Sequence, residues 1–294
     1  MQALKYVVTA DIARTLEYKI GMKGVTQLPA LKRDIGYLED AFLSRFQGVL
    51  DPALNLYKIP ADALAAEMEI KTEQVQAERN LKNVVSMDKV YAPNADLFYE
   101  ITRETDPRTG KKGYELKNRW GTPPLEEQVA LIRKKILACP SGGTNASDHK
   151  VLLVDIGAFS GDTLEFAVKQ FEANQVKVGA MVIGLSAERT EPELRVRFGH
   201  AMNILQVHAL KDWLELRDLL LIDGRKVPDE FTRDGRRAFI PYTEKMSDWA
   251  TVPKKNASTA REICLDYNAK LIEILKNNGF ETSAIGDFVQ MFRE

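Results

Sequence analysis

The stretch VLLVDIGAFSGDTLEFAV, which begins at Val151, combines an acidic residue, small residues and hydroxyls in a pattern typical of a ligand-binding loop. An aliphatic run leads to Asp155, and a loop of small residues then precedes a helical pattern. Glycine lets the backbone approach a ligand closely, and the first turn of a helix presents unpaired N–H groups to an anion. With the hydroxyls of Ser160 and Thr163 as further donors, the stretch predicts a phosphate site, in which Asp155 accepts hydrogen bonds from sugar hydroxyls.

The sequence around this loop alternates between expected strands and expected helices. Continuous apolar runs predict buried strands, and amphipathic runs between them predict helices. Such alternation is typical of a parallel sheet covered on both faces, with ligands beyond the carboxyl ends of its strands. The sequence therefore predicts a Rossmann-like α/β core. Its expected strands are 151–156, 178–187, 203–209 and 218–223, and its expected helices are 162–175 and 193–202.

The flanking segments have a different character. Apolar spacing predicts a helix over 28–50, and strong helix formers predict another that begins after Pro60. A hairpin is expected between 97–103 and 113–118, and further helices over 125–138 and 258–279. The expected division is an N-terminal helical region, 1–89, and an α/β domain with a C-terminal helix, 90–294. The polar helix after Pro60 is either a solvated face or a surface for a protein or nucleoprotein partner.

Composition excludes several classes of function. The chain has 41 Lys and Arg against 42 Asp and Glu, so no global field draws it to nucleic acid or to an anionic membrane, although local basic patches leave a nucleic-acid contact open. Its two cysteines form no CxxC pair, which indicates a reducing, cytoplasmic setting. No apolar run reaches membrane-spanning length, and the first residues lack the layout of a signal peptide. The three histidines show no zinc spacing.

The stretch resembles the signature of the phosphoribosyltransferase superfamily, in which an aliphatic strand, an acidic residue and a Thr/Ser-Gly-x-Thr loop follow one another. Here VLLV is the strand, Asp155 the acid and 160–163 the loop. The resemblance implies that Asp155 holds the ribose of phosphoribosyl pyrophosphate, and that Mg²⁺ bridges the pyrophosphate and the hydroxyls. In an active enzyme, pyrophosphate would leave the anomeric carbon. The loop implied to wrap the 5′-phosphate consists of Phe159, Ser160, Gly161, Asp162 and Thr163.

The chain departs from the family pattern in two places. Ile156 stands where a second acid is usual, and Asp162 places a carboxylate where a phosphate should bind. Asp162 fits a helix-capping pattern equally well. The family also implies a pyrophosphate loop after an earlier strand; none is evident before Val151, and GTPPLEE or SGGTN are the substitutes. Arg225, after the expected fourth strand, is a candidate pyrophosphate ligand by bidentate hydrogen bonding.

Three interpretations of the function stay open. The stretches KDWLELRDLLLIDGRKVP (211–228) and FIPYTEKMSDWATVP (239–253) resemble phosphoribosyltransferase-like effectors of bacterial anti-phage operons, including some retrons. The resemblance implies a role in phage defence. The missing second acid and pyrophosphate loop favour a non-catalytic protein that senses a nucleotide. Alternatively, DIGAFSG matches the Asp-x-Gly-x-x-x-Gly motif of S-adenosylmethionine-dependent methyltransferases through Gly157 and Gly161, although Ser186 stands where that fold needs an acid.

Overall fold

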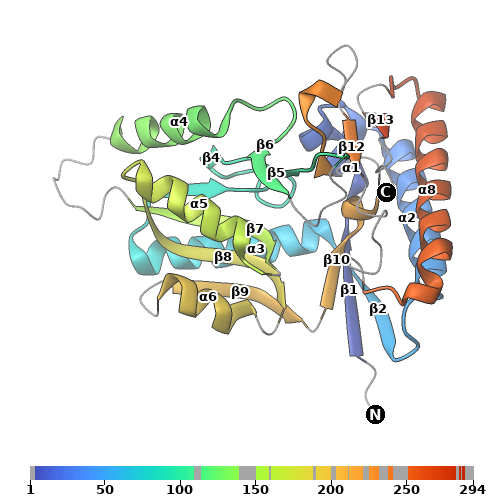
Figure 1. The fold of residues 1–294 in the computed structure, drawn as a ribbon, viewed down its shortest axis with the longest axis horizontal. Coiled ribbons are helices and arrows are strands. Elements are labelled where there is room, and N and C mark those ends of the chain that lie inside the picture. The colour runs from blue at the N-terminus through green and yellow to red at the C-terminus, as the bar shows by residue number, and fades with distance from the viewer. Residues whose placement is uncertain are drawn as a thin grey trace. The chain divides into compact units, whose positions relative to one another are not determined.

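The computed structural model divides the chain into two compact units (Figure 1). Unit 1 comprises residues 1–60, 102–115 and 213–294, and unit 2 comprises 61–101 and 116–212. The described residues are 4–108, 114–138, 150–158, 160–187, 190–199, 203–210, 212–220, 225–231, 238–240, 251–282, 285 and 287–288.

A three-stranded sheet with the order β10-β1-β2 begins unit 1. Strands β1 (Leu4–Ala10) and β2 (Leu54–Pro60) run parallel, and β10 (Asp212–Glu215) lies on the other side of β1. Because the partners are parallel, a crossover must connect them. That crossover contains α1 (Ile12–Thr15), a π-helical turn (Leu16–Ile20), a 3₁₀ turn (Val25–Gln27) and α2 (Pro29–Gln47).

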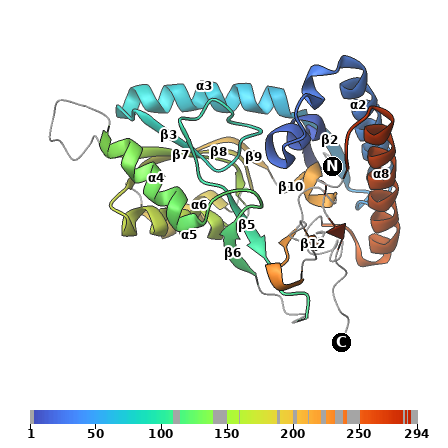
Figure 2. The same cartoon turned by 90° about the horizontal axis from the view of Figure 1, so that it is seen from above.

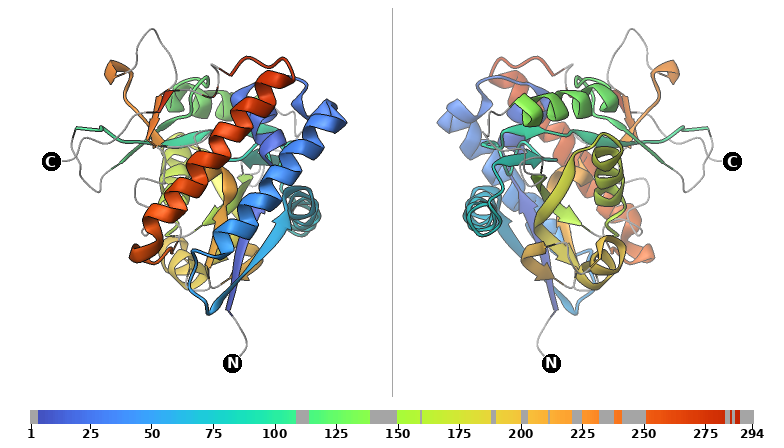
Figure 3. Two further views of the ribbon diagram at one scale, coloured as in Figure 1. Left: turned by 90° about the vertical axis from the view of Figure 1, so that its right-hand side faces the viewer. Right: turned by 90° about the vertical axis from the view of Figure 1, so that its left-hand side faces the viewer.

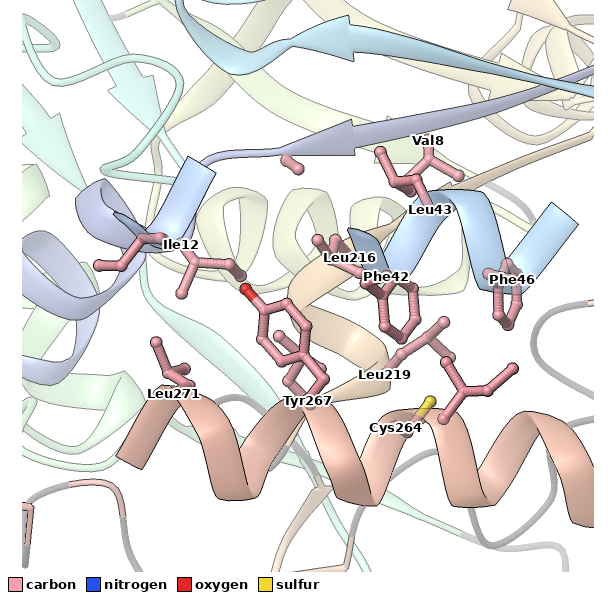
Figure 4. Close-up of a cluster of buried hydrophobic side chains, with 14 of the residues drawn as sticks. Val8, Ile12, Phe42, Leu43, Phe46, Leu216, Leu219, Cys264, Tyr267 and Leu271 are labelled. Carbon is pink, nitrogen blue, oxygen red and sulfur yellow. The ribbon is translucent and has the colours of Figure 1, made fainter. Parts of the chain in front are cut away.

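The core of unit 1 forms where α2 lies beside α8 (Ala257–Asn277), as the left view of Figure 3 shows. Phe42 of α2 contacts Phe46 in a stacked geometry and Tyr267 of α8 edge-on, with ring centroids 5.3 and 5.4 Å away. Aliphatic side chains from β1, α1 and the 3₁₀ turn Leu216–Leu219 complete the cluster (Figure 4). Residues from both ends of the sequence therefore share one core.

A buried carboxylate lies at the edge of this core. Glu39 of α2 accepts a hydrogen bond from the backbone N–H of Ile12 at 2.9 Å, so it satisfies a donor at the start of α1. The Nζ of Lys58 lies 3.2 Å from its Oε2. Burial raises the pKa of Glu39, because the charged form loses solvation, and these two partners oppose the rise only in part.

A second sheet has the order β13-β12-β11-β5-β6. Strand β11 is antiparallel to β12 and parallel to β5, and β12 is parallel to β13. A 3₁₀ turn, Asp229–Phe231, lies between β11 and β12 in the sequence, and another, Lys254–Asn256, directly precedes α8. The strands are β5 (Ile101–Glu104), β6 (Glu115–Asn118), β11 (Arg225–Lys226), β12 (Ala238–Ile240) and β13 (Asp287–Phe288).

Unit 2 is built on a parallel five-stranded sheet with the order β4-β3-β7-β8-β9. The chain moves from β3 outward to β4 and then returns to the other side of β3 with β7. The strand order therefore reverses between β3 and β7, which is where open α/β sheets bind their ligands. The strands are β3 (Asn83–Ser86), β4 (Leu97–Phe98), β7 (Lys150–Ala158), β8 (Lys177–Ala187) and β9 (Asn203–Leu210).

Helices cover both faces of this sheet, with α3 on one face and α4, α5 and α6 on the other (Figure 2). The apolar side chains of α5 recur at Leu164, Ala167, Val168 and Phe171, one stripe of a helix, and all four are buried. They share a core with the adjacent strands and with α4. The helices are α3 (Ala61–Arg79), α4 (Leu125–Ala138), α5 (Asp162–Ala173) and α6 (Thr190–Phe198).

The parallel α/β core expected from the sequence is confirmed, and so are helices α2, α3, α4, α5 and α8. The segment 1–89, expected to be helical, also contains β1, β2 and β3, and the expected boundary at residue 89 falls inside unit 2. The fourth strand expected over 218–223 is wrong for its described part, where a 3₁₀ turn ends at Leu219. Among the described residues, no helix is long and apolar enough to cross a bilayer.

Candidate functional site

The loop between β7 and α5 follows the central strand of unit 2, on the carboxyl side of the point where the strand order reverses. Gly161 is the last residue before α5 and has φ +75°, a left-handed conformation that side chains rarely adopt. A Cβ at this position would lie 2.3 Å from Cδ2 of Leu194, which belongs to α6. Glycine is therefore required here both by the backbone and by close packing of α6.

The polar side chains of the loop are tied together. Ser160 Oγ donates a hydrogen bond to Asp162 Oδ2 at 2.8 Å. Arg197 of α6 donates to Asp162 Oδ1 at 2.7 Å and to Glu165 Oε2 at 3.0 Å. Because the guanidinium offsets the charge of Asp162, an anion that approaches the start of α5 meets a neutral pair rather than a bare carboxylate. Lys169 donates to Glu165 from one turn further along the helix, at 2.6 Å.

Asp155 lies inside β7 rather than after it, three residues before the strand ends at Ala158. It pairs with Ile183 of β8 and is half-buried. Its Oδ1 accepts a hydrogen bond from the backbone N–H of Ile156 at 2.8 Å. Ile156, which stands where the family has its second acid, is 6% exposed. The strand therefore carries one carboxylate at this level, not two.

The neighbouring strand β8 supplies a hydroxyl that the sequence analysis noted only as a departure from the methyltransferase pattern. Ser186 of β8 pairs with Ala158 of β7, is 0% exposed, and its hydroxyl has no hydrogen-bond partner among the described residues. A buried hydroxyl without a partner costs free energy, so a native structure needs a reason to keep it. The end of β8, next to the loop, therefore carries a buried hydroxyl whose partner lies outside the described protein atoms.

Strand β3 is the earlier buried strand that the sequence did not make evident. It is too short for periodicity to reveal, yet all four of its residues are buried, and it pairs with β7 from Asn83↔Val151 to Ser86↔Val154. After it, the backbone N–H of Val90 donates to Asp88 Oδ1 at 2.8 Å, which fixes the turn. Lys89 then contacts Glu100 at 2.6 Å and lies over the ring of Phe98.

The predicted site residues belong to different units of the chain. Asp155 and Ser160 to Thr163 belong to unit 2, on or directly after β7. Arg225 belongs to unit 1, where it is a buried residue of β11 paired with Ile240. Phe159 lies outside the described residues, as does the SGGTN loop.

The described residues offer no group that would hold Mg²⁺ without a ligand. Within the described parts of the chain, no group of three or more His, Cys, Asp and Glu side chains could hold a metal ion. Mg²⁺ is commonly held by one or two carboxylates together with substrate phosphates, so a single carboxylate such as Asp155 does not suffice without a ligand.

Comparison with known proteins adds no assignment. No family model matches the chain, and no curated protein sequence matches it.

Proposed function

We propose that unit 2 binds phosphoribosyl pyrophosphate or a related phosphorylated nucleotide at the carboxyl edge of its parallel sheet. The observation that carries the proposal is the place of the 160–163 loop: it joins the central strand β7 to the start of α5, beside the reversal of strand order. In such sheets this edge is the ligand crevice, and a helix start binds phosphate. The buried hydroxyl of Ser186 supports the same edge independently.

In this proposal the loop binds the 5′-phosphate through backbone amides of the first turn of α5 and the hydroxyls of Ser160 and Thr163. Asp155 accepts hydrogen bonds from the ribose hydroxyls. The loop after β3, with Lys89 as its cation, takes the place of the pyrophosphate loop that the family resemblance implies. Mg²⁺ enters only with the pyrophosphate of the ligand.

Binding without turnover is favoured over catalysis. Displacement of pyrophosphate passes through an oxocarbenium-like transition state, which needs charge stabilisation at the sugar. The strand offers one carboxylate there, already hydrogen-bonded to the N–H of Ile156, and a buried isoleucine replaces the second acid. We therefore propose a sensor of a phosphorylated nucleotide whose output passes to a protein or nucleoprotein partner. The resemblance to anti-phage effectors suggests phage defence as the setting.

Isothermal titration with phosphoribosyl pyrophosphate and Mg²⁺ tests the proposal, with S-adenosylmethionine as the competing ligand. We expect saturable binding of the first compound, no binding of the second, and no release of pyrophosphate. Thr163→Val should weaken binding about 10- to 150-fold, since one hydrogen bond to a charged group contributes about 1.5–3 kcal/mol. Thr72→Val makes the same change on α3, on the opposite face of the sheet, and should leave binding unchanged.

A preference for S-adenosylmethionine would make the methyltransferase interpretation correct. Release of pyrophosphate on binding would show that the protein is an enzyme. An absence of binding by both compounds would refute the proposed site.

A further inference from the structure

Asp162 accepts the hydrogen bonds that a bound phosphate would be expected to accept. Its two carboxylate oxygens receive one bond from the loop hydroxyl of Ser160 and one from the guanidinium of Arg197, at 2.8 and 2.7 Å. A carboxylate and a phosphate use the same donors, and arginine binds both through its planar fork. The side chain thus stands in for a ligand's phosphoryl oxygens at the start of α5.

Arg197 is held over the loop from several sides. Glu165, on the next turn of α5, accepts a second bond from it at 3.0 Å. The hydrogen bond from Lys169 and the charge of Arg197 lower the pKa of Glu165, so this carboxylate stays ionised at neutral pH. Leu194, three residues earlier on α6, packs directly against Gly161. Helix α6 is therefore fixed over the loop by one apolar contact and one ionic contact.

The exchange of Asp162 for a ligand requires little movement. The side chain of Asp162 is 50% exposed and that of Arg197 is 31% exposed, so rotation of Asp162 into solvent disturbs no core packing. An exposed ion pair contributes at most about 1 kcal/mol, which a doubly charged phosphate that also meets the helix start can outweigh.

We infer that Arg197 is a phosphate-selecting residue of the proposed site, and that Asp162 occupies its guanidinium until a phosphorylated ligand replaces it. The inference rests on the proposed function, and it deepens it by adding α6 to the ligand-binding residues. Because Leu194 and Arg197 lie on the same short helix, replacement of Asp162 by the ligand also removes one of the two ionic contacts of α6 with α5 and leaves the contact with Glu165. Ligand binding at the start of α5 therefore also changes the contacts of α6.

Titration of the whole chain with inorganic phosphate and with phosphoribosyl pyrophosphate tests this inference. Asp162→Asn keeps the size of the side chain and removes its charge. We expect it to bind both anions about tenfold more tightly, because the competitor for Arg197 is weakened. Arg197→Gln should bind both about tenfold more weakly, and Arg197→Lys should recover only part of the loss, since lysine cannot bind bidentately. Glu193→Gln, which removes the same charge from an exposed position of α6, should bind like the unmodified protein.

The outcomes separate the two proposals. If the unmodified protein binds phosphoribosyl pyrophosphate but Asp162→Asn shows no gain or Arg197→Gln no loss, the inference is wrong and the proposed function stands. If neither the unmodified protein nor Asp162→Asn binds either anion, both are wrong. Circular dichroism checks that each variant folds; should Arg197→Gln fail, Arg197→Lys and Asp162→Asn still decide the result.

Discussion

Gly161 connects the loop, the start of α5 and α6, so its replacement by alanine is the sharpest structural test. The residue has φ +75°, and a Cβ would lie 2.3 Å from Cδ2 of Leu194, which is fully buried. A left-handed backbone costs a non-glycine residue about 1–2 kcal/mol, and forced packing costs about 1–3 kcal/mol. Gly161→Ala should therefore lower the free energy of unfolding by about 2–5 kcal/mol.

A double-mutant cycle separates the two contributions. Leu194→Ala alone should cost about 2–5 kcal/mol, as deletion of a buried leucine does. In the Leu194→Ala variant, the methyl group that Gly161→Ala adds has room, so only the cost of the left-handed backbone remains. We therefore expect Gly161→Ala to cost about 1–3 kcal/mol less in this variant than in the unmodified protein. Urea unfolding followed by far-ultraviolet circular dichroism measures each variant, and hydrogen exchange of α5 locates the effect in unit 2.

The matched control is Gly36→Ala. Gly36 lies in the interior of α2, and a Cβ there would meet nothing within 4 Å. This change should raise stability by about 0.5–1 kcal/mol, because alanine favours a helix over glycine. The reasoning about Gly161 is refuted if Gly161→Ala costs no more than a typical surface change, about 0.5 kcal/mol, or if Leu194→Ala gives no relief.

Two further predictions concern buried polar groups. Ser186→Ala should leave stability unchanged or raise it by about 1 kcal/mol, since it removes a buried hydroxyl that has no partner in the described part of the fold; a loss in thermal unfolding would show that the hydroxyl is satisfied. Burial raises the pKa of Glu39, so the folded state binds a proton at this carboxylate more tightly than the unfolded chain does. The stability that this proton contributes is therefore lost as pH rises from about 4.5 through the folded pKa. The stability of the unmodified protein relative to Glu39→Gln should fall over that range in urea titrations, and a flat difference would contradict the desolvation of Glu39.

The sequence predicted the long elements of unit 2 because their patterns are local. The apolar run that begins at Val151 predicts β7, and the apolar stripe from Leu164 to Phe171 predicts α5. The apolar residues of both patterns are buried in the structure. Strands β3 and β4 have four and two residues, too few for any period. They form because they pair in a sheet centred on β7, and sequence spacing alone does not report such long-range pairing.

Unit 1 was harder to predict for a related reason. Strand β1 pairs with β2 about fifty residues later, and Tyr267 completes a core begun by Phe42. The candidate site likewise combines local and long-range features. The loop of Ser160 and Gly161 is a local motif that the sequence shows, whereas the hydrogen bond from Arg197 to Asp162 joins residues 35 positions apart. That contact depends on how the β8–α6–β9 crossover places α6 over the loop, which only the folded structure reveals.

Isothermal titration of the 294-residue chain with phosphoribosyl pyrophosphate and Mg²⁺ decides whether the loop at the start of α5 is a phosphate site. We predict saturable binding that weakens in Thr163→Val and tightens in Asp162→Asn. Unchanged affinity in both variants would place any bound ligand elsewhere on the protein, and no heat of binding at all would contradict a phosphate site at the start of α5.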